Sequence, residues 1–181
     1  MPAHVFVDES KHCCYLVAAA ALDPAGLAEA RKAIQQFIMP RQRRVHFAKE
    51  GNPRRDKFLG VINGLGITAT IYDASHYRRE KEARPACLRR LVADLAIMKA
   101  ERLVLEIDDS VAQADKRLLR EEVKRVGLAA CLRYELLRAH EECLLAVPDA
   151  IAWCWARGGE WRDKVKDLVT HVHQVHESPD P

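Results

Sequence analysis

Short apolar runs near the start of the chain predict the first two β-strands. Residues 5–10 form one run that ends in polar positions, and residues 14–22 form another that is apolar almost throughout. A strand that is apolar on both faces is typical of a sheet covered on both sides. Because only Lys11 and His12 stand between the polar end of the first run and the second, we expect an antiparallel hairpin.

Apolar positions at three- and four-residue spacing predict helices after this hairpin. Asp23 and Pro24 suit the N-cap and first residue of one helix, which ends before Pro40. Further helices are expected at residues 52–64, 85–98 and 142–156, where proline and glycine positions mark several of the ends. A polar helix is expected to end with residues 121–126, before Gly127. A last amphipathic helix is expected at residues 160–175, on which His171 and His173 would face apart.

The remaining patterns complete a mixed α/β fold. Residues 67–72 and 103–107 indicate two more strands, residues 45–47 a short extended piece, and residues 128–137 a late edge strand. Strands that then alternate with helices are typical of a mixed sheet with helices on both faces. The chain shows no internal repeat and no long linker, so we expect one domain over residues 1–181, with residues 177–181 as a frayed tail.

Length and composition set broad limits. A chain of 181 residues can bury roughly 70% of its unfolded surface, and 49% apolar with 30% charged residues is ordinary for a globular protein. No apolar stretch approaches the roughly 20 residues of a membrane span, and the N-terminus does not resemble a signal peptide. We therefore expect a cytoplasmic protein with no membrane partner, whose six cysteines are reduced thiols because none lies in a C-x-x-C pair.

The formal net charge of +3 does not point to any binding partner, but the distribution of the charged residues along the chain is informative. Residues 39–57 hold seven Lys or Arg against two acids, and residues 78–90 hold six against two. Such runs can neutralise the phosphates of a nucleic acid, although either alone is also typical of a solvated surface. The candidate substrate-binding residues are Arg43, Arg44, Lys49 and Arg54.

Acidic residues lie in apolar surroundings at three distant places. Asp8 ends the first strand, Glu106 and Asp108 end the strand at 103–107, and Asp149 lies in the helical segment 142–156. Because side chains alternate along a strand, Glu106 and Asp108 should share a face. If the two strands are neighbours, Asp8 and Asp108 could approach each other, and Asp149 could join them from a helix packed across the strand ends.

Clustered carboxylates suit Mg²⁺ or Mn²⁺, which prefer oxygen ligands. We expect Asp8, Asp108 and Asp149 as metal ligands, with Glu106 assisting and His46 orienting a phosphate or transferring a proton. Each also has a structural alternative: the aspartates as caps of turns or helices, Glu106 as the partner of an arginine, and His46 as a packed histidine.

Four short motifs resemble a known family in their order along the chain. They are Asp-Glu-Ser after the first strand (residues 6–10), a His-containing motif (45–47), Ile-Asp at a strand end (106–108) and a late Asp (145–149). Together they resemble domain of unknown function 3800, within the ribonuclease H-like fold. The chain departs from the family pattern at Lys11, which replaces a glycine, and at Ala146 and Pro148, which replace Gln and Ala before Asp149.

The resemblance implies the fold and the place of a carboxylate site rather than a substrate. The leading interpretation is a divalent-metal-dependent nuclease or related phosphodiester-processing enzyme. The alternative is a non-catalytic module of the same fold that binds nucleic acid or a protein partner. An aspartyl-phosphate phosphatase with Asp8 as nucleophile is disfavoured, because Ser10 stands where such enzymes carry a second aspartate as the acid.

Overall fold

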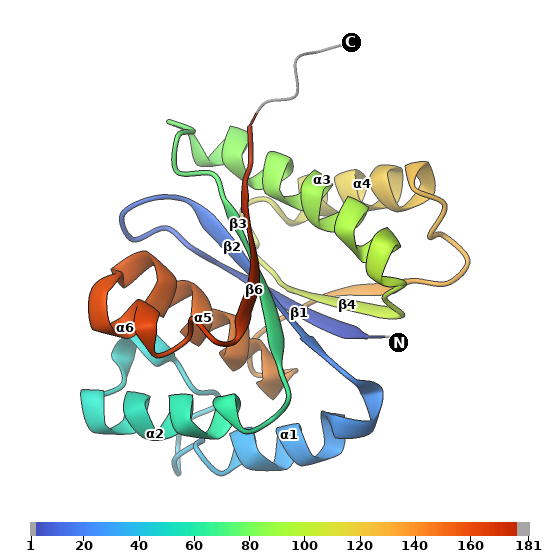
Figure 1. Ribbon diagram of the computed structural model, residues 1–181. Helices are drawn as coiled ribbons and strands as arrows, with labels where there is room; N and C mark the ends of the chain where they lie inside the picture. The colour runs from blue at the N-terminus through green and yellow to red at the C-terminus, as the bar shows by residue number, and fades with distance from the viewer. Residues whose placement is uncertain (1–2, 177–181) are drawn as a thin grey trace.

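A computed structural model describes residues 3–176 as six strands in one mixed sheet, with helices on both faces (Figure 1). The strand order is β5-β4-β1-β2-β3-β6. Strand β2 is antiparallel to β1 and to β3, whereas the pairs β1–β4, β4–β5 and β3–β6 are parallel. The strands are β1 (His4–Ser10), β2 (Leu16–Leu22), β3 (Thr68–Asp73), β4 (Arg102–Glu106), β5 (Arg133–Leu137) and β6 (Val169–Gln174).

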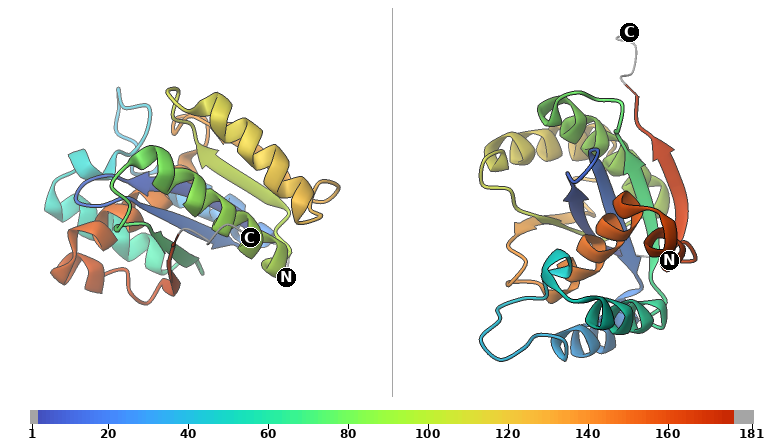
Figure 2. Two further views of the ribbon diagram at one scale, coloured as in Figure 1. Left: turned by 90° about the horizontal axis from the view of Figure 1, so that it is seen from above. Right: turned by 90° about the vertical axis from the view of Figure 1, so that its left-hand side faces the viewer.

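The helices form two layers, one on each side of the sheet (Figure 2). On one side, α1 (Leu27–Gln35), α2 (Asn52–Asn63) and α5 (Ala146–Arg157) cover the sheet, with α6 (Gly159–Asp163) beyond α5. On the other side lie α3 (Glu80–Met98) and α4 (Ala112–Arg125). Three short 3₁₀ helices complete the chain: η1 (Pro24–Gly26), η2 (Phe47–Lys49) and η3 (Cys143–Leu145).

The central hairpin divides its side chains between two hydrophobic cores. Phe6 and Ala18 point to the side of α5, whereas Val5, Val7 and Val17 point to the side of α3. This division follows from the two-residue period of a strand. Both cores are buried, so the predicted sheet with helices on both faces is confirmed. Asp8, which shares its face with Phe6, is thereby directed toward α5.

Most predicted elements are present, and Pro148 lies in the first turn of α5, where its missing N–H is not needed. The edge strand expected within residues 128–137 is β5, which pairs only with β4. Residues 45–47 do not form a strand. His46 is extended, but Phe47 already begins η2, whose residue Lys49 donates its N–H to the carbonyl of His46.

The predicted helix at residues 160–175 is wrong, because α6 ends at Asp163 and β6 follows. Valines at positions 165, 169, 172 and 175 have helical spacing, but β-branched residues also favour a strand that can pair, and β3 offers an open edge. As a consequence His171 and His173 share a face, and their rings stack with centroids 6.2 Å apart.

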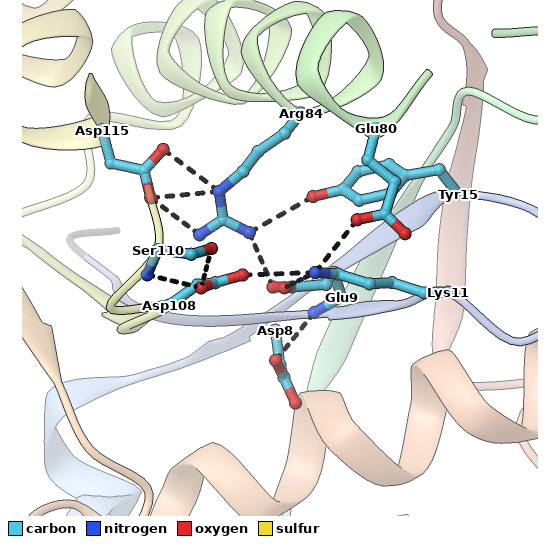
Figure 3. Close-up of polar contacts among 9 residues, drawn as sticks. All are labelled: Asp8, Glu9, Lys11, Tyr15, Glu80, Arg84, Asp108, Ser110 and Asp115. Carbon is cyan, nitrogen blue, oxygen red and sulfur yellow. Dashed lines mark hydrogen bonds and ion pairs between the residues drawn. The ribbon is translucent and has the colours of Figure 1, made fainter. Parts of the chain in front are cut away.

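A buried ion-pair network fixes the end of β1 from the side of α3 (Figure 3). Arg84 on α3 is 5% exposed and binds the Asp115 carboxylate on α4 through Nε and Nη2, at 2.8–3.1 Å. Its Nη1 contacts the Glu9 carboxylate at 2.8 Å and donates to the Tyr15 hydroxyl at 3.2 Å. Arg84 therefore joins both helices of this layer to β1 and to the residue that precedes β2.

We predict that Arg84→Met destabilises the protein by about 3–5 kcal/mol, because it leaves the buried Asp115 without its cation and Glu9 with Lys11 alone, at 3.6 Å. Urea unfolding at neutral pH measures this change. Arg89→Met is the matched control. Arg89 also connects α3 to α4, through Glu122 at 3.7 Å, but it is 58% exposed and should cost about 0–1 kcal/mol. Equal destabilisation of the two variants would contradict the central role of Arg84.

Candidate carboxylate site

Three acidic side chains meet on the side of the sheet that faces α5. Asp8 lies near the end of β1, Glu106 is the last residue of β4, and Asp149 lies in the first turn of α5. Strands β1 and β4 are parallel neighbours in which Phe6 pairs with Val104, so Asp8 and Glu106 follow one period later on the same face. Helix α5 packs directly on β1 and brings Asp149 to them.

Mutual repulsion and burial disturb all three carboxyl groups. Burial raises the pKa of Asp8 well above its usual range, and the charges of Glu106 and Asp149 raise it further. Burial also raises the pKa of Glu106, against the opposing effect of Arg44, and the pKa of Asp149. Clustered carboxylates with raised pKa values are typical of functional sites, because a packed core has no need of them.

The cluster has few compensating partners. Arg44 donates from Nη1 to Glu106 Oε1 at 3.1 Å, and the backbone N–H of Phe47 donates to Asp149 Oδ2 at 3.1 Å. The backbone N–H of Glu9 donates to Asp8 Oδ1 at 2.8 Å. The second oxygen of Glu106, Oε2, is buried without a hydrogen-bond partner among residues 3–176. A free, buried carboxylate oxygen in a group of three acids fits a hard divalent cation.

The arrangement is not a preformed metal site. Among residues 3–176, no three His, Cys, Asp or Glu side chains are placed so that they could together hold a metal ion. The donor chemistry of Asp8, Glu106 and Asp149 fits Mg²⁺ or Mn²⁺, which take oxygen ligands. The guanidinium group of Arg44, which is paired with Glu106, lies beside this donor set.

Asp108 lies apart from the other two predicted ligands. Its carboxylate contacts Lys11 Nζ at 3.2 Å and accepts from the N–H and hydroxyl of Ser110, at 2.9 and 2.5 Å. In Figure 3 these groups lie on one side of β1, while Asp8 points toward the helix on the other. The bonds from Ser110 and Lys11 lower the pKa of Asp108 to about 2. Asp108 was expected to share a face with Glu106. It does not, because β4 ends at Glu106 and side chains alternate regularly only within a strand.

His46 lies next to the carboxylates, at the start of η2. Burial lowers its pKa, while the Asp149 charge acts in the opposite direction. Its Nδ1 atom is buried and has no hydrogen-bond partner. A neutral imidazole with a free ring nitrogen can accept or donate a proton at this position.

The four candidate substrate-binding residues differ in what they contact. The side chains of Arg43 and Lys49 are exposed and make no hydrogen bond or ion pair with the described part of the chain. Arg54 instead binds Glu50 at 2.7 Å and the carbonyl of Phe37 at 2.7 Å, so it ties α2 to the preceding segments. Arg43 and Lys49 are free to contact a ligand, Arg44 is held by Glu106, and Arg54 is engaged in the fold.

A cleft of about 620 Å³ opens beside Glu106. Sequence reasoning missed two of its basic residues, Arg138 and His140, which follow β5. The only signal was their position just after a strand whose placement was ambiguous. The cleft is lined by Arg43, Arg44, Glu106, Ile107, Arg138, Ala139, His140 and Glu141.

The fold is ribonuclease H-like, a mixed α/β sheet that carries acids at adjacent strand ends. The structure is similar to a chain in the solved "PCNA:RNase HII complex from Archaeoglobus fulgidus", with a TM-score of 0.58 and 17% sequence identity. The match covers 92% of this chain and 76% of that chain. No family model and no curated protein matches the sequence. Within residues 3–176 no helix has the length and apolar character needed to span a membrane.

We predict that Asp8→Asn stabilises the metal-free protein at neutral pH by about 0.5–2 kcal/mol, because it removes a carboxyl group whose ionised form the folded cluster disfavours. The pKa of Asp8 is higher in the folded than in the unfolded state. The folded state therefore holds more protons, and the wild type loses stability as the pH rises from about 4 through the folded pKa.

The gain from Asp8→Asn should accordingly be largest at neutral pH and vanish below about pH 4, where both states are protonated. Urea unfolding in EDTA across this range measures it. Asp167→Asn, an exposed aspartate beyond α6, is the control and should change little. A destabilising effect of Asp8→Asn at neutral pH would contradict repulsion in the cluster.

Proposed function

We propose that this protein is a divalent-metal-dependent nuclease or a related phosphodiester-processing enzyme, and that it belongs to the domain of unknown function 3800 family. The observation that carries the proposal is the convergence of Asp8, Glu106 and Asp149 from β1, β4 and α5. Partly buried acids that repel one another cost stability, and a bound cation would offset that cost. The similarity of the fold to that of an RNase HII structure supports the same class of reaction.

The roles of the residues follow from their surroundings. Asp8, Glu106 and Asp149 would hold Mg²⁺ or Mn²⁺ through carboxylate oxygens. A bound cation of this kind activates a water molecule and stabilises the leaving oxygen of a phosphodiester. His46, beside Asp149, would exchange a proton with the water or the leaving group. Asp108 would act outside this group, as the partner of Lys11.

We further propose that the substrate is a nucleic acid. Arg43 and Lys49 are exposed, lack partners within the described chain, and lie in the segment that also supplies Arg44 and His46. The cleft beside Glu106 adds Arg138 and His140. Phosphate contacts by such side chains fix the position of a nucleic acid without reading its sequence.

The second candidate is a non-catalytic module of this fold that binds nucleic acid or a protein. The observation that favours it is the ion pair between Arg44 and Glu106, together with the absence from residues 3–176 of a preformed group of three metal-binding side chains. In such a module, Arg44 would be the permanent partner of Glu106. The two candidates differ in their response to divalent cations.

We predict that Mn²⁺ or Mg²⁺ raises the melting temperature of the wild type, because the cation binds only the folded site. At a concentration of about 100 times Kd the stabilisation is about 2.7 kcal/mol. Asp8→Asn and Asp149→Asn should abolish the shift and any cleavage of DNA or RNA. Thermal unfolding with and without metal measures the shift.

Asp108→Asn is the informative control for this experiment, because Asp108 lies with Lys11 and Ser110. It should retain the metal-induced shift. No shift in the wild type would favour the non-catalytic candidate, and abolition of the shift in Asp108→Asn would return Asp108 to the ligand set.

We also predict that Arg43→Gln weakens the binding of single-stranded nucleic acid. It should reduce the slope of log K against log salt concentration by about 0.7 for each phosphate that the variant no longer neutralises. Fluorescence anisotropy over a range of salt concentrations measures the slope. Arg117→Gln, on the exposed surface of α4 across the sheet, makes the same change of charge and should leave the slope unaltered. Equal effects of the two variants would indicate a response to net charge alone.

A further inference from the structure

Arg44 lies between two chemically different surroundings. Its Nη1 contacts Glu106 Oε1 at 3.1 Å, and the same side chain lines the basic cleft. The Arg44 side chain is 32% exposed, so it is not locked in place as Arg84 is at 6%. Arginine binds carboxylate and phosphate with the same planar set of donors, so exchange between these two partners needs no new chemistry.

The carboxylate cluster contains one directly paired cation. Within residues 3–176, Asp8 and Asp149 have no ion pair, and Glu106 is paired with Arg44 alone. Arg44 approaches one oxygen of Glu106 and leaves the other, Oε2, buried without a partner. A single charge on one side of the cluster compensates three acids incompletely. The pairing is therefore one that a doubly charged cation can displace.

Resting on the proposed function, we propose that Arg44 exchanges partners. It holds Glu106 in the metal-free protein, and it turns to a backbone phosphate of the nucleic acid in the cleft once a divalent cation is bound at the carboxylates. Arg44 thus competes with the metal in the absence of substrate and helps to bind substrate when the metal is present.

The neighbours of Arg44 in the cleft support a phosphate as the second partner. Arg43 and Arg138 line the same cleft, and Arg43 has no partner within the described chain. Arg138 is paired with Asp109 at 2.8 Å and adds positive charge without being free itself. A volume of about 620 Å³ is ample for a nucleotide unit, since small-ligand sites span about 300–1,000 Å³.

The first experiment compares Arg44→Gln with Arg43→Gln by titrating each metal-free protein with Mn²⁺ in a calorimeter. Removal of a competing side chain raises the fraction of binding-competent protein, so Arg44→Gln should tighten Mn²⁺ binding about five- to tenfold. Arg43→Gln makes the same change of charge one residue away and should leave the Mn²⁺ affinity unchanged. Both variants should weaken binding of a short single-stranded DNA with hydroxyl groups at both ends, measured with Ca²⁺.

Any one of three outcomes would contradict the proposed exchange of partners by Arg44. They are an unchanged or weaker Mn²⁺ affinity in Arg44→Gln, an equal gain in Arg43→Gln, or wild-type DNA affinity in Arg44→Gln. If the wild type itself binds no Mn²⁺, the proposed metal-dependent function fails, and the exchange fails with it. This outcome differs from the three above, in which the wild type binds Mn²⁺ but Arg44 does not compete with it.

A second pair of variants tests release of Arg44 without any metal. In EDTA, Glu106→Gln weakens the hold on Arg44 and should raise the affinity for the same DNA about three- to tenfold. Glu141→Gln removes an equal charge from the same cleft, and its amide oxygen can still accept the N–H of Arg138. The proposal requires a larger gain in Glu106→Gln than in Glu141→Gln, and equal gains overturn it.

Discussion

The buried contacts of Arg84 are the constraint on which the arrangement of this protein depends. Asp8 and Glu9 are consecutive residues of β1, so their side chains leave the sheet in opposite directions. Glu9 meets Arg84, which also binds Asp115 and Tyr15 and so joins α3, α4 and the hairpin. With the end of β1 fixed from that side, Asp8 is presented to α5 regardless of the repulsion that it meets there.

The acidic side chains on the two sides of the sheet therefore differ in how fully their charges are compensated. On the side of α3 the carboxylates of Glu9, Asp108 and Asp115 each have a cationic partner. On the side of α5 three acids share one half-exposed arginine, and their pKa values are raised. The first side stabilises the fold, and the second holds charge that is incompletely compensated. Such a division between stability and function is common in enzymes.

The sequence allowed the fold class, the hairpin and the convergence of Asp8 with Asp149 to be predicted, because these depend on strong local patterns. The placement of Asp108 depends on where β4 ends, which a single residue decides and which alternation alone cannot reveal. An arginine partner for Glu106 was among the alternatives and is present, but the sequence could not identify it as Arg44, because a loop sets its position. Strand β6 was mistaken for a helix because its valines have helical spacing, and the open edge of β3 is what selects the strand for these β-branched residues.

The order of the elements along the chain has a consequence for biosynthesis. Strands β1, β2 and β3 leave the ribosome first and pair as sequence neighbours, before β4 adds Glu106 and long before α5 adds Asp149. The nascent chain can thus pair three of the six described strands while its acids are still distant from one another. The repulsion among all three acids therefore arises only once α5 has been synthesised, when the strands on which it packs already exist.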